Sequence, residues 1–92
     1  MTDTIKIRSS EISLSNTTAN TVSSASVVRI VNADAANSVE ITLANSTGTI
    51  GTITLGHNVT NFSEICLIKQ PADTIVFTGT SPNIKAVSIG YF

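Results

Sequence analysis

The side chains that could carry out chemistry in this sequence are few and stand apart. Nucleophilic catalysis needs a Ser, Cys or Thr that a base activates and a third group orients. The chain has one histidine, His57, in a Gly-His-Asn turn sequence, where a solvated imidazole is expected rather than a base. Glu40 and Glu64 could approach each other across a sheet, but neither belongs to a recognisable motif. We therefore predict that the chain is not an enzyme.

The sequence does not indicate a metal or cofactor site either. Zinc needs clustered Cys, His or carboxylate ligands, and the one cysteine and one histidine here are nine positions apart. Asn32, Asp34 and Asn37 could in principle hold Ca²⁺, but we interpret them as a turn built from Asx side chains. Residues 48–51, Gly-Thr-Ile-Gly, lack the spacing and the lysine of a phosphate-binding loop. No metal and no cofactor is expected.

Charge and hydropathy argue against two classes of partner. Charged residues make up 12% of the chain, and five basic against six acidic residues provide little driving force for binding nucleic acid. Lys6 and Arg8 form a short basic stripe, which we interpret as a solvated outer face of the first strand. No apolar run reaches the ~20 residues needed to span a bilayer. We predict that neither nucleic acid nor a membrane is a partner.

The N-terminus and the single cysteine bear on where the chain is made and how it is stabilised. Residues 1–6 lack the basic and apolar regions of a secretory signal, so synthesis in the host cytoplasm without a signal peptide is expected. Cys66 cannot form an internal disulfide, and the apolar run 65–68 around it predicts a buried, inert thiol. Partner subunits are then the remaining source of extra stability for so small a domain.

Composition and spacing predict an all-β fold. The β-branched residues Ile, Val and Thr number 12, 8 and 14, and such side chains favour strands. Strand patterns recur every eight to twelve residues, which is typical of a sandwich or barrel. We predict one domain over residues 1–92, a small antiparallel β-sandwich of jelly-roll or immunoglobulin-like type with seven or eight strands. Residues 15–26 are expected to be a polar loop, long enough to be mobile. The expected strands cover residues 5–8, 12–14, 27–32, 39–43, 49–55, 62–69, 74–78 and 84–92.

Turn-forming residues separate these strands. Residues 45–48, Asn-Ser-Thr-Gly, should reverse the chain because they accept positive φ or bond to their own backbone. Residues 71–73, Pro-Ala-Asp, predict a tight corner in which the proline presets φ and the aspartate accepts backbone hydrogen bonds. The strands supply the expected core residues, among them Ile41, Phe62, Phe77 and Ile89.

Two of the expected strands carry apolar residues on both faces. They lie at residues 27–31 and 65–68. A strand in a two-layer sandwich needs one apolar face, so the second face must be central, covered by a loop, or docked on another subunit. The terminal aromatic pair could anchor a partner in the same way. We therefore predict a homo-oligomer, with these interface candidates: Val27, Val31, Cys66, Ile68, Tyr91 and Phe92.

Three stretches occur in a characteristic order along the chain. They are Val-Arg-Ile-Val-Asn at 28–32, Lys-Gln-Pro-Ala-Asp-Thr-Ile at 69–75, and Ile-Lys-Ala-Val-Ser-Ile-Gly-Tyr at 84–91. This order resembles small β-sandwich virion proteins of tailed bacteriophages. In those proteins a Lys-x-Pro-x-Asp-Thr-Ile-like corner precedes a last strand that ends in Tyr or Phe. The resemblance covers residues 27–92 and leaves the N-terminal quarter unmatched.

The resemblance implies a non-enzymatic structural subunit of a phage particle. The expected role is a capsid decoration (cement) protein that binds the assembled head, with other virion proteins, the major capsid or tail protein, as partners and the virion as location. The alternatives are a tail or neck component, and a β-sandwich that binds a cell-surface glycan through its polar loops. Such families have no transferable catalytic residues, so no functional position is carried over.

Overall fold

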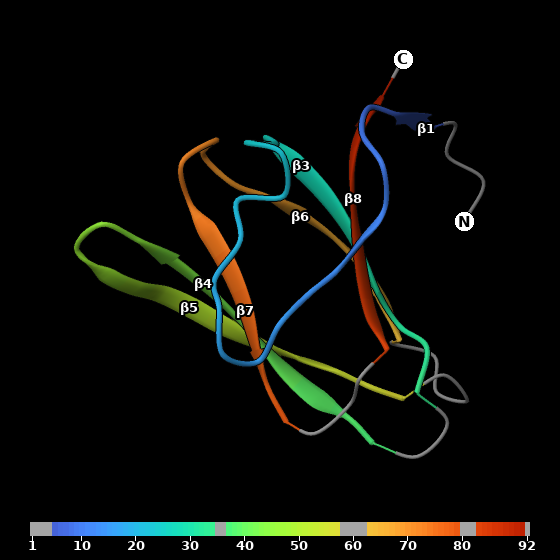
Figure 1. Ribbon diagram of the computed structural model, residues 1–92, viewed down its shortest axis with the longest axis vertical. Helices are drawn as coiled ribbons and strands as arrows, with labels where there is room; N and C mark the ends of the chain where they lie inside the picture. The colour runs from blue at the N-terminus through green and yellow to red at the C-terminus, as the bar shows by residue number, and fades with distance from the viewer. Residues whose placement is uncertain (1–4, 35–36, 58–62, 80–82, 92) are drawn as a thin grey trace.

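The chain forms two facing antiparallel β-sheets (Figure 1). This computed structural model describes residues 5–34, 37–57, 63–79 and 83–91, with the backbone alone considered for Ile5 and Tyr91. Each strand pattern expected from the sequence corresponds to an observed strand, and β3 and β7 have the expected bounds. The eight strands are β1 (Ile5–Ile7), β2 (Ile12–Ser13), β3 (Val27–Asn32), β4 (Val39–Asn45), β5 (Gly48–Leu55), β6 (Glu64–Ile68), β7 (Thr74–Thr78) and β8 (Ile84–Tyr91).

The strand order defines which type of sandwich this is. The larger sheet has the order β1-β8-β3-β6, with β2 also pairing with β8, and the smaller sheet has the order β5-β4-β7. β4 and β5 form a hairpin, whereas the connections β3–β4, β5–β6, β6–β7 and β7–β8 each cross from one sheet to the other. This is the connectivity of a jelly roll, one of the two sandwich types that the sequence left open.

The larger sheet is built on β8. This strand pairs with β1 and β2 on one side and with β3 on the other. The backbone beside β1 and β2 continues the pairing: the N–H groups of Arg8 and Leu14 donate to the carbonyl oxygens of Ser88 and Ile84, both over 2.8 Å. The last strand of the chain is therefore integrated into the sheet, as its alternating apolar residues predicted.

The core lies between the sheets, because alternate residues of each strand point inward. In β3 every second residue is buried, and Ile30 at its centre is fully enclosed. Ile41 of β4 and Phe77 of β7 are partners in the ladder and belong to the core, as expected. Ile89 is also buried, although the register places it on the outer face of β8. Phe62, the other expected core residue, lies outside the described residues.

Residues 15–26 pack along the edge of β7 that β4 leaves free. Asn20 and Ile75 exchange backbone hydrogen bonds of 3.0 and 2.8 Å across this edge. Val22 and Ala25 then enter the core, with Val22 only 1% exposed. The sequence predicted a polar loop here. It did not predict the burial of Val22 and Ala25, because these two residues stand alone among Ser and Thr residues and show no strand period.

The predicted corner after β6 is present and is held by a buried lysine. Lys69 is 5% exposed, and its Nζ donates to the carbonyl oxygens of Gln70 and Pro71 over 3.2 and 3.3 Å. The Asp73 carboxylate accepts a hydrogen bond of 3.1 Å from the Gln70 N–H, as expected. Burial lowers the pKa of Lys69 below its ordinary value of 10.5, and the charge of Asp73 partly opposes this shift. The Lys-x-Pro-x-Asp pattern thus has a structural explanation.

The burial of facing residues predicts unequal effects of the same substitution. Ile41 and Ile53 are ladder partners, but Ile41 is 1% and Ile53 46% exposed. Ile41→Ala should lower the free energy of unfolding by about 2 to 5 kcal/mol because it leaves a cavity. Ile53→Ala should lower it by roughly 1 kcal/mol, because only part of a side chain is lost from apolar contact. Urea unfolding followed by circular dichroism measures both, and equal losses would show that the core is placed wrongly.

The lowered pKa of Lys69 predicts a pH dependence of stability. Between the lowered pKa and about 10.4, the unfolded chain binds more protons at this lysine than the folded chain does, so stability rises with pH in this window. The free energy of unfolding of the unsubstituted chain, minus that of Lys69→Met, should therefore increase from pH 7 towards about 10.4. A difference that stays flat or falls over this range would contradict the burial of a charged ammonium.

Candidate functional site

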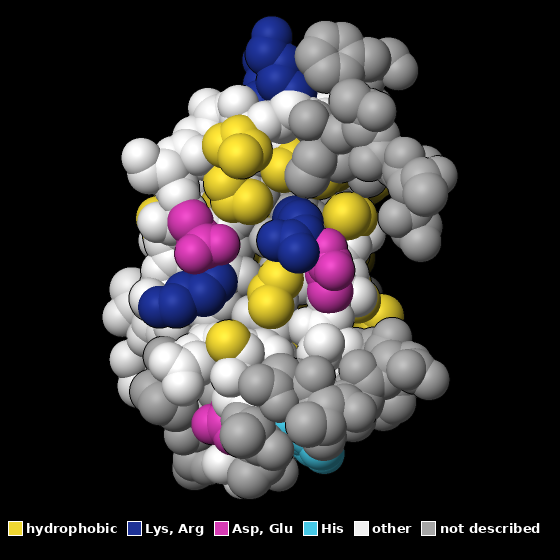
Figure 2. Space-filling view, turned by 90° about the vertical axis from the view of Figure 1, so that its right-hand side faces the viewer, with side chains coloured by type: hydrophobic (Ala, Val, Ile, Leu, Met, Phe, Trp, Pro, Cys, Tyr) yellow, Lys and Arg dark blue, Asp and Glu magenta, His cyan; other side chains and the backbone are white. Residues whose placement is uncertain are grey.

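A row of apolar side chains crosses the outer face of the larger sheet, exposed at its two ends and buried at Ile89, which is 2% exposed. We call it the apolar row and define it as Ile68 of β6, Val27 of β3, Ile89 of β8 and Ile7 of β1. Val27 pairs with Ile68 and Ile7 pairs with Ile89, while the register of β3 with β8 places Val27 beside Ile89. The two ends of the row are strongly exposed, Ile68 by 80% and Ile7 by 71%. Figure 2 views this side of the molecule and shows hydrophobic side chains among acidic and basic groups.

The alternation of β3 and β6 explains why this face is apolar. Their inward residues fill the core, so the apolar residues at intervening positions point outward. Four of the six interface candidates, Val27, Val31, Cys66 and Ile68, accordingly lie on this one face. The Tyr91 side chain and Phe92 are outside the part of the chain that the structure describes.

Two sequence interpretations on this sheet were wrong. Cys66 was expected to be a buried thiol, but it is exposed, because β6 is an edge strand and only Ile65 and Leu67 turn towards the core. The basic stripe was expected on the outer face of the first strand. The register instead turns Ile7 outward, and Arg8 lies against Gly90 at the inner side of the sheet.

Charged side chains lie beside the apolar row. Arg29 and Glu64 form an ion pair on the outer face, with side chains 33% and 48% exposed. Val31 is flanked in register by Glu64 on β6 and by Lys85 on β8. Lys85 donates a hydrogen bond of 2.7 Å to the Ser13 hydroxyl. Because exposed ion pairs contribute about 0–1 kcal/mol to stability, these groups affect what can approach the face more than they affect the fold.

The residues that could do chemistry are not brought together. Glu40 lies on the smaller sheet and Glu64 on the larger one, while His57 is half-buried just after β5. The oxygen-rich turn is closed by its own side chains. The Asn32 amide oxygen accepts from the Asp34 N–H over 2.9 Å, and the Asp34 carboxylate accepts from the N–H of Asn37 over 2.9 Å. Within the described residues, no three His, Cys, Asp or Glu side chains are placed to share a metal ion.

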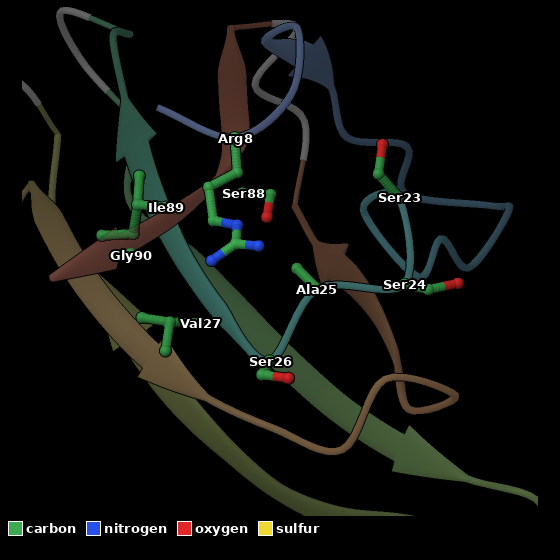
Figure 3. Close-up of a pocket in the computed structure, with 9 residues that line it drawn as sticks. All are labelled: Arg8, Ser23, Ser24, Ala25, Ser26, Val27, Ser88, Ile89 and Gly90. Carbon is green, nitrogen blue, oxygen red and sulfur yellow. The ribbon is translucent and has the colours of Figure 1, made fainter. Parts of the chain in front are cut away.

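A polar pocket opens at one end of the sandwich. It has a volume of about 410 Å³ and lies between the loop at residues 23–27, the end of β8 at residues 88–90, and Arg8. In Figure 3 the Arg8 guanidinium extends into this space beside the Ser88 hydroxyl. Sequence reasoning did not find this pocket, because its walls come from three distant parts of the chain.

The open edge of the smaller sheet is the third feature of the surface. β5 is a sequence of Gly, Thr, Ile and Leu without charge or proline, and all of it except Leu55 is exposed. A bulge between Leu43 and Ala44 leaves Ile50 out of the ladder, and an apolar groove of about 210 Å³ lies beside it. The apolar side chains of this groove are Ile41, Leu43, Ile50, Ile53 and Leu67.

The geometry therefore defines a small jelly-roll domain with an exposed apolar face. Comparison with protein-family models, curated proteins and solved structures found no match. Among the residues described, no helix has the length and apolar character needed to cross a membrane.

Proposed function

We propose that this chain is a non-enzymatic structural subunit that associates through the apolar row. The observation that carries the proposal is the exposure of Ile68 and Ile7 at the two ends of the apolar row, with the half-buried Val27 and the buried Ile89 between them. Large apolar side chains that are this exposed on one face of a sheet are unfavourable in water and are typical of a contact with another protein. In the part of the chain that the structure describes, His57, Glu40 and Glu64 lie apart and no three metal-ligating side chains meet, so an enzyme has no comparable support.

The charges on the same face favour a second copy of this chain as the first partner. Glu64 and Lys85 lie on opposite sides of β3, at the same level along the strands. A two-fold axis parallel to β3 and above it exchanges these two sides of the sheet and keeps the position along the strands. The apolar rows of two copies then face each other, and Glu64 of each copy meets Lys85 of the other. The apolar rows and the Glu64 and Lys85 side chains are thus complementary across this axis, while Arg29, on β3 itself, lies near its own copy and keeps Glu64 of its own chain as partner.

We propose that the particle is a tailed-phage virion. We favour decoration of the head over a position in the tail or neck. The support is the resemblance of residues 27–92 to virion β-sandwiches, together with a jelly-roll connectivity that is common in viral capsid domains. Jelly rolls also occur in lectins, so fold alone does not separate assembly from glycan binding. The apolar row favours assembly, because sugar recognition relies on polar groups and stacking aromatics.

A charge placed in the apolar row should abolish association without unfolding the chain. Ile68→Asp would bury an unpaired carboxylate in the contact and should weaken self-association by about 100-fold or more. The matched control is Thr54→Asp, at an exposed position on the outer face of the smaller sheet. Light scattering reports the mass, circular dichroism the fold, and co-sedimentation with heads or tails of a phage that encodes the chain reports attachment.

The outcomes of this experiment separate the parts of the proposal. A folded monomer that no longer sediments with heads, beside an unaffected Thr54→Asp control, is the expected result. An unfolded Ile68→Asp monomer would assign this surface to the core, contrary to its exposure. An unsubstituted chain that stays monomeric at high concentration and sediments with neither heads nor tails would overturn the assembly role. Sedimentation with tails alone would overturn head decoration.

The two-fold arrangement makes a separate prediction about charge. Glu64→Lys and Lys85→Glu each place like charges opposite one another and should weaken dimerisation by roughly 5- to 10-fold, as for an exposed pair worth about 1 kcal/mol. The double variant restores opposite charges and should recover most of the affinity. Sedimentation equilibrium measures the constants, with circular dichroism checking the fold because Glu64 also pairs with Arg29. Additive losses in the double variant would exclude this axis.

A further inference from the structure

The pocket beside Arg8 holds polar groups that the fold itself does not use. Arg8 forms no ion pair through its guanidinium with the described residues, and no carboxylate lines the pocket. The residue Ser88 is 7% exposed, and its hydroxyl lines the pocket without a hydrogen-bond partner in the described part of the chain. The guanidinium and this hydroxyl are therefore available to a molecule that enters the pocket. Figure 3 shows that this hydroxyl and the guanidinium point into the same space.

The wall opposite β8 is a loop with an unusual backbone. Val22, Ser23 and Ser24 all have left-handed φ values, of 55°, 57° and 54°. Such values are uncommon for residues other than glycine, and most of all for a β-branched residue. Each costs of the order of 1–3 kcal/mol and persists only where the surroundings enforce it. Here the burial of the Val22 side chain and a hydrogen bond of 2.7 Å, donated by the Val22 N–H to the side-chain oxygen Oδ1 of Asn20, enforce the conformation. The wall is therefore fixed before any ligand arrives.

We infer that this pocket binds a sugar-sized molecule carrying one carboxylate, such as a uronic acid. The volume of about 410 Å³ falls within the range of small-molecule sites. A guanidinium matches a carboxylate through two parallel hydrogen bonds, and a single cation balances one negative charge better than the two of a phosphate. The Ser88 hydroxyl, which lies beside the guanidinium in Figure 3, supplies a partner for a sugar hydroxyl. The inference goes beyond the proposed assembly role and does not rest on it.

Titration with sodium glucuronate, followed by the backbone amide signals of the full chain in NMR, tests the inference. We expect saturable shifts confined to residues 23–27 and 88–90, and no such shifts with glucose. Arg8→Gln should weaken binding by about 10-fold or more, because it removes a charge-assisted hydrogen-bond pair. Lys6→Gln is the matched control: it removes the same charge two residues before Arg8, in β1, but lies outside the pocket, and should leave the affinity unchanged.

Several results would overturn this assignment. The inference fails if glucuronate produces no local shifts at tens of millimolar, or if glucose produces the same ones. It also fails if a folded Arg8→Gln variant binds as well as the unsubstituted chain, or if Lys6→Gln loses as much affinity. Tighter binding of inorganic phosphate than of glucuronate would contradict the choice of a singly charged carboxylate. Because the pocket shares Val27 and Ile89 with the apolar row, light scattering of the same samples checks that the mass is unchanged, and at unchanged mass these outcomes leave the assembly proposal standing.

Discussion

The backbone ladders of β8 are the constraint on which the rest of this structure depends. The last strand of the chain pairs with the first two and with β3, so it joins residues that are up to 86 positions apart in the register, as between Ile5 and Tyr91. Side chains alternate along a strand, and a slip of one residue would turn the whole set over. The same register therefore places Ile84 and Ala86 in the core, Ile89 in the apolar row, and Ser88 in the pocket.

Both candidate surfaces arise from this one strand and overlap, because the pocket uses Ser88 on the inner face and also reaches Ile89 and Val27 of the apolar row. The outer face is apolar because β3, β6 and β8 have more β-branched residues than a two-layer core can enclose. The inner face opens at its end, where Gly90 leaves room for the Arg8 side chain: a Cβ at this glycine would lie 3.3 Å from the Arg8 Cδ. The proposed assembly and the proposed ligand binding would thus both depend on a single sheet, whose other side the smaller sheet covers.

Much of the fold could be predicted from local pattern, and the surfaces could be predicted only in part. The alternation in β3 and β7 gave their bounds, and the apolar surplus at Val27 and Ile68 indicated a second face. The predictions that were wrong concern features that depend on pairing between distant parts of the chain. Whether Cys66 is covered depends on β6 being an edge strand, and the direction of Arg8 depends on its register with β8. Short-range sequence patterns predict neither strand order nor register, and the pocket depends on both.

The two long sides of the sandwich are protected unequally. On one side, residues 15–26 form backbone hydrogen bonds with the edge strand β7. On the other side, β5 presents eight uncharged residues whose outer backbone groups face water. A contact between two faces of the larger sheet closes on itself after two copies, whereas strand addition at an edge needs no matching side chains and has no natural end. A pair formed as proposed would therefore stop at two copies, whereas strand addition at β5 would continue, because β5 carries no lysine that would oppose a second strand.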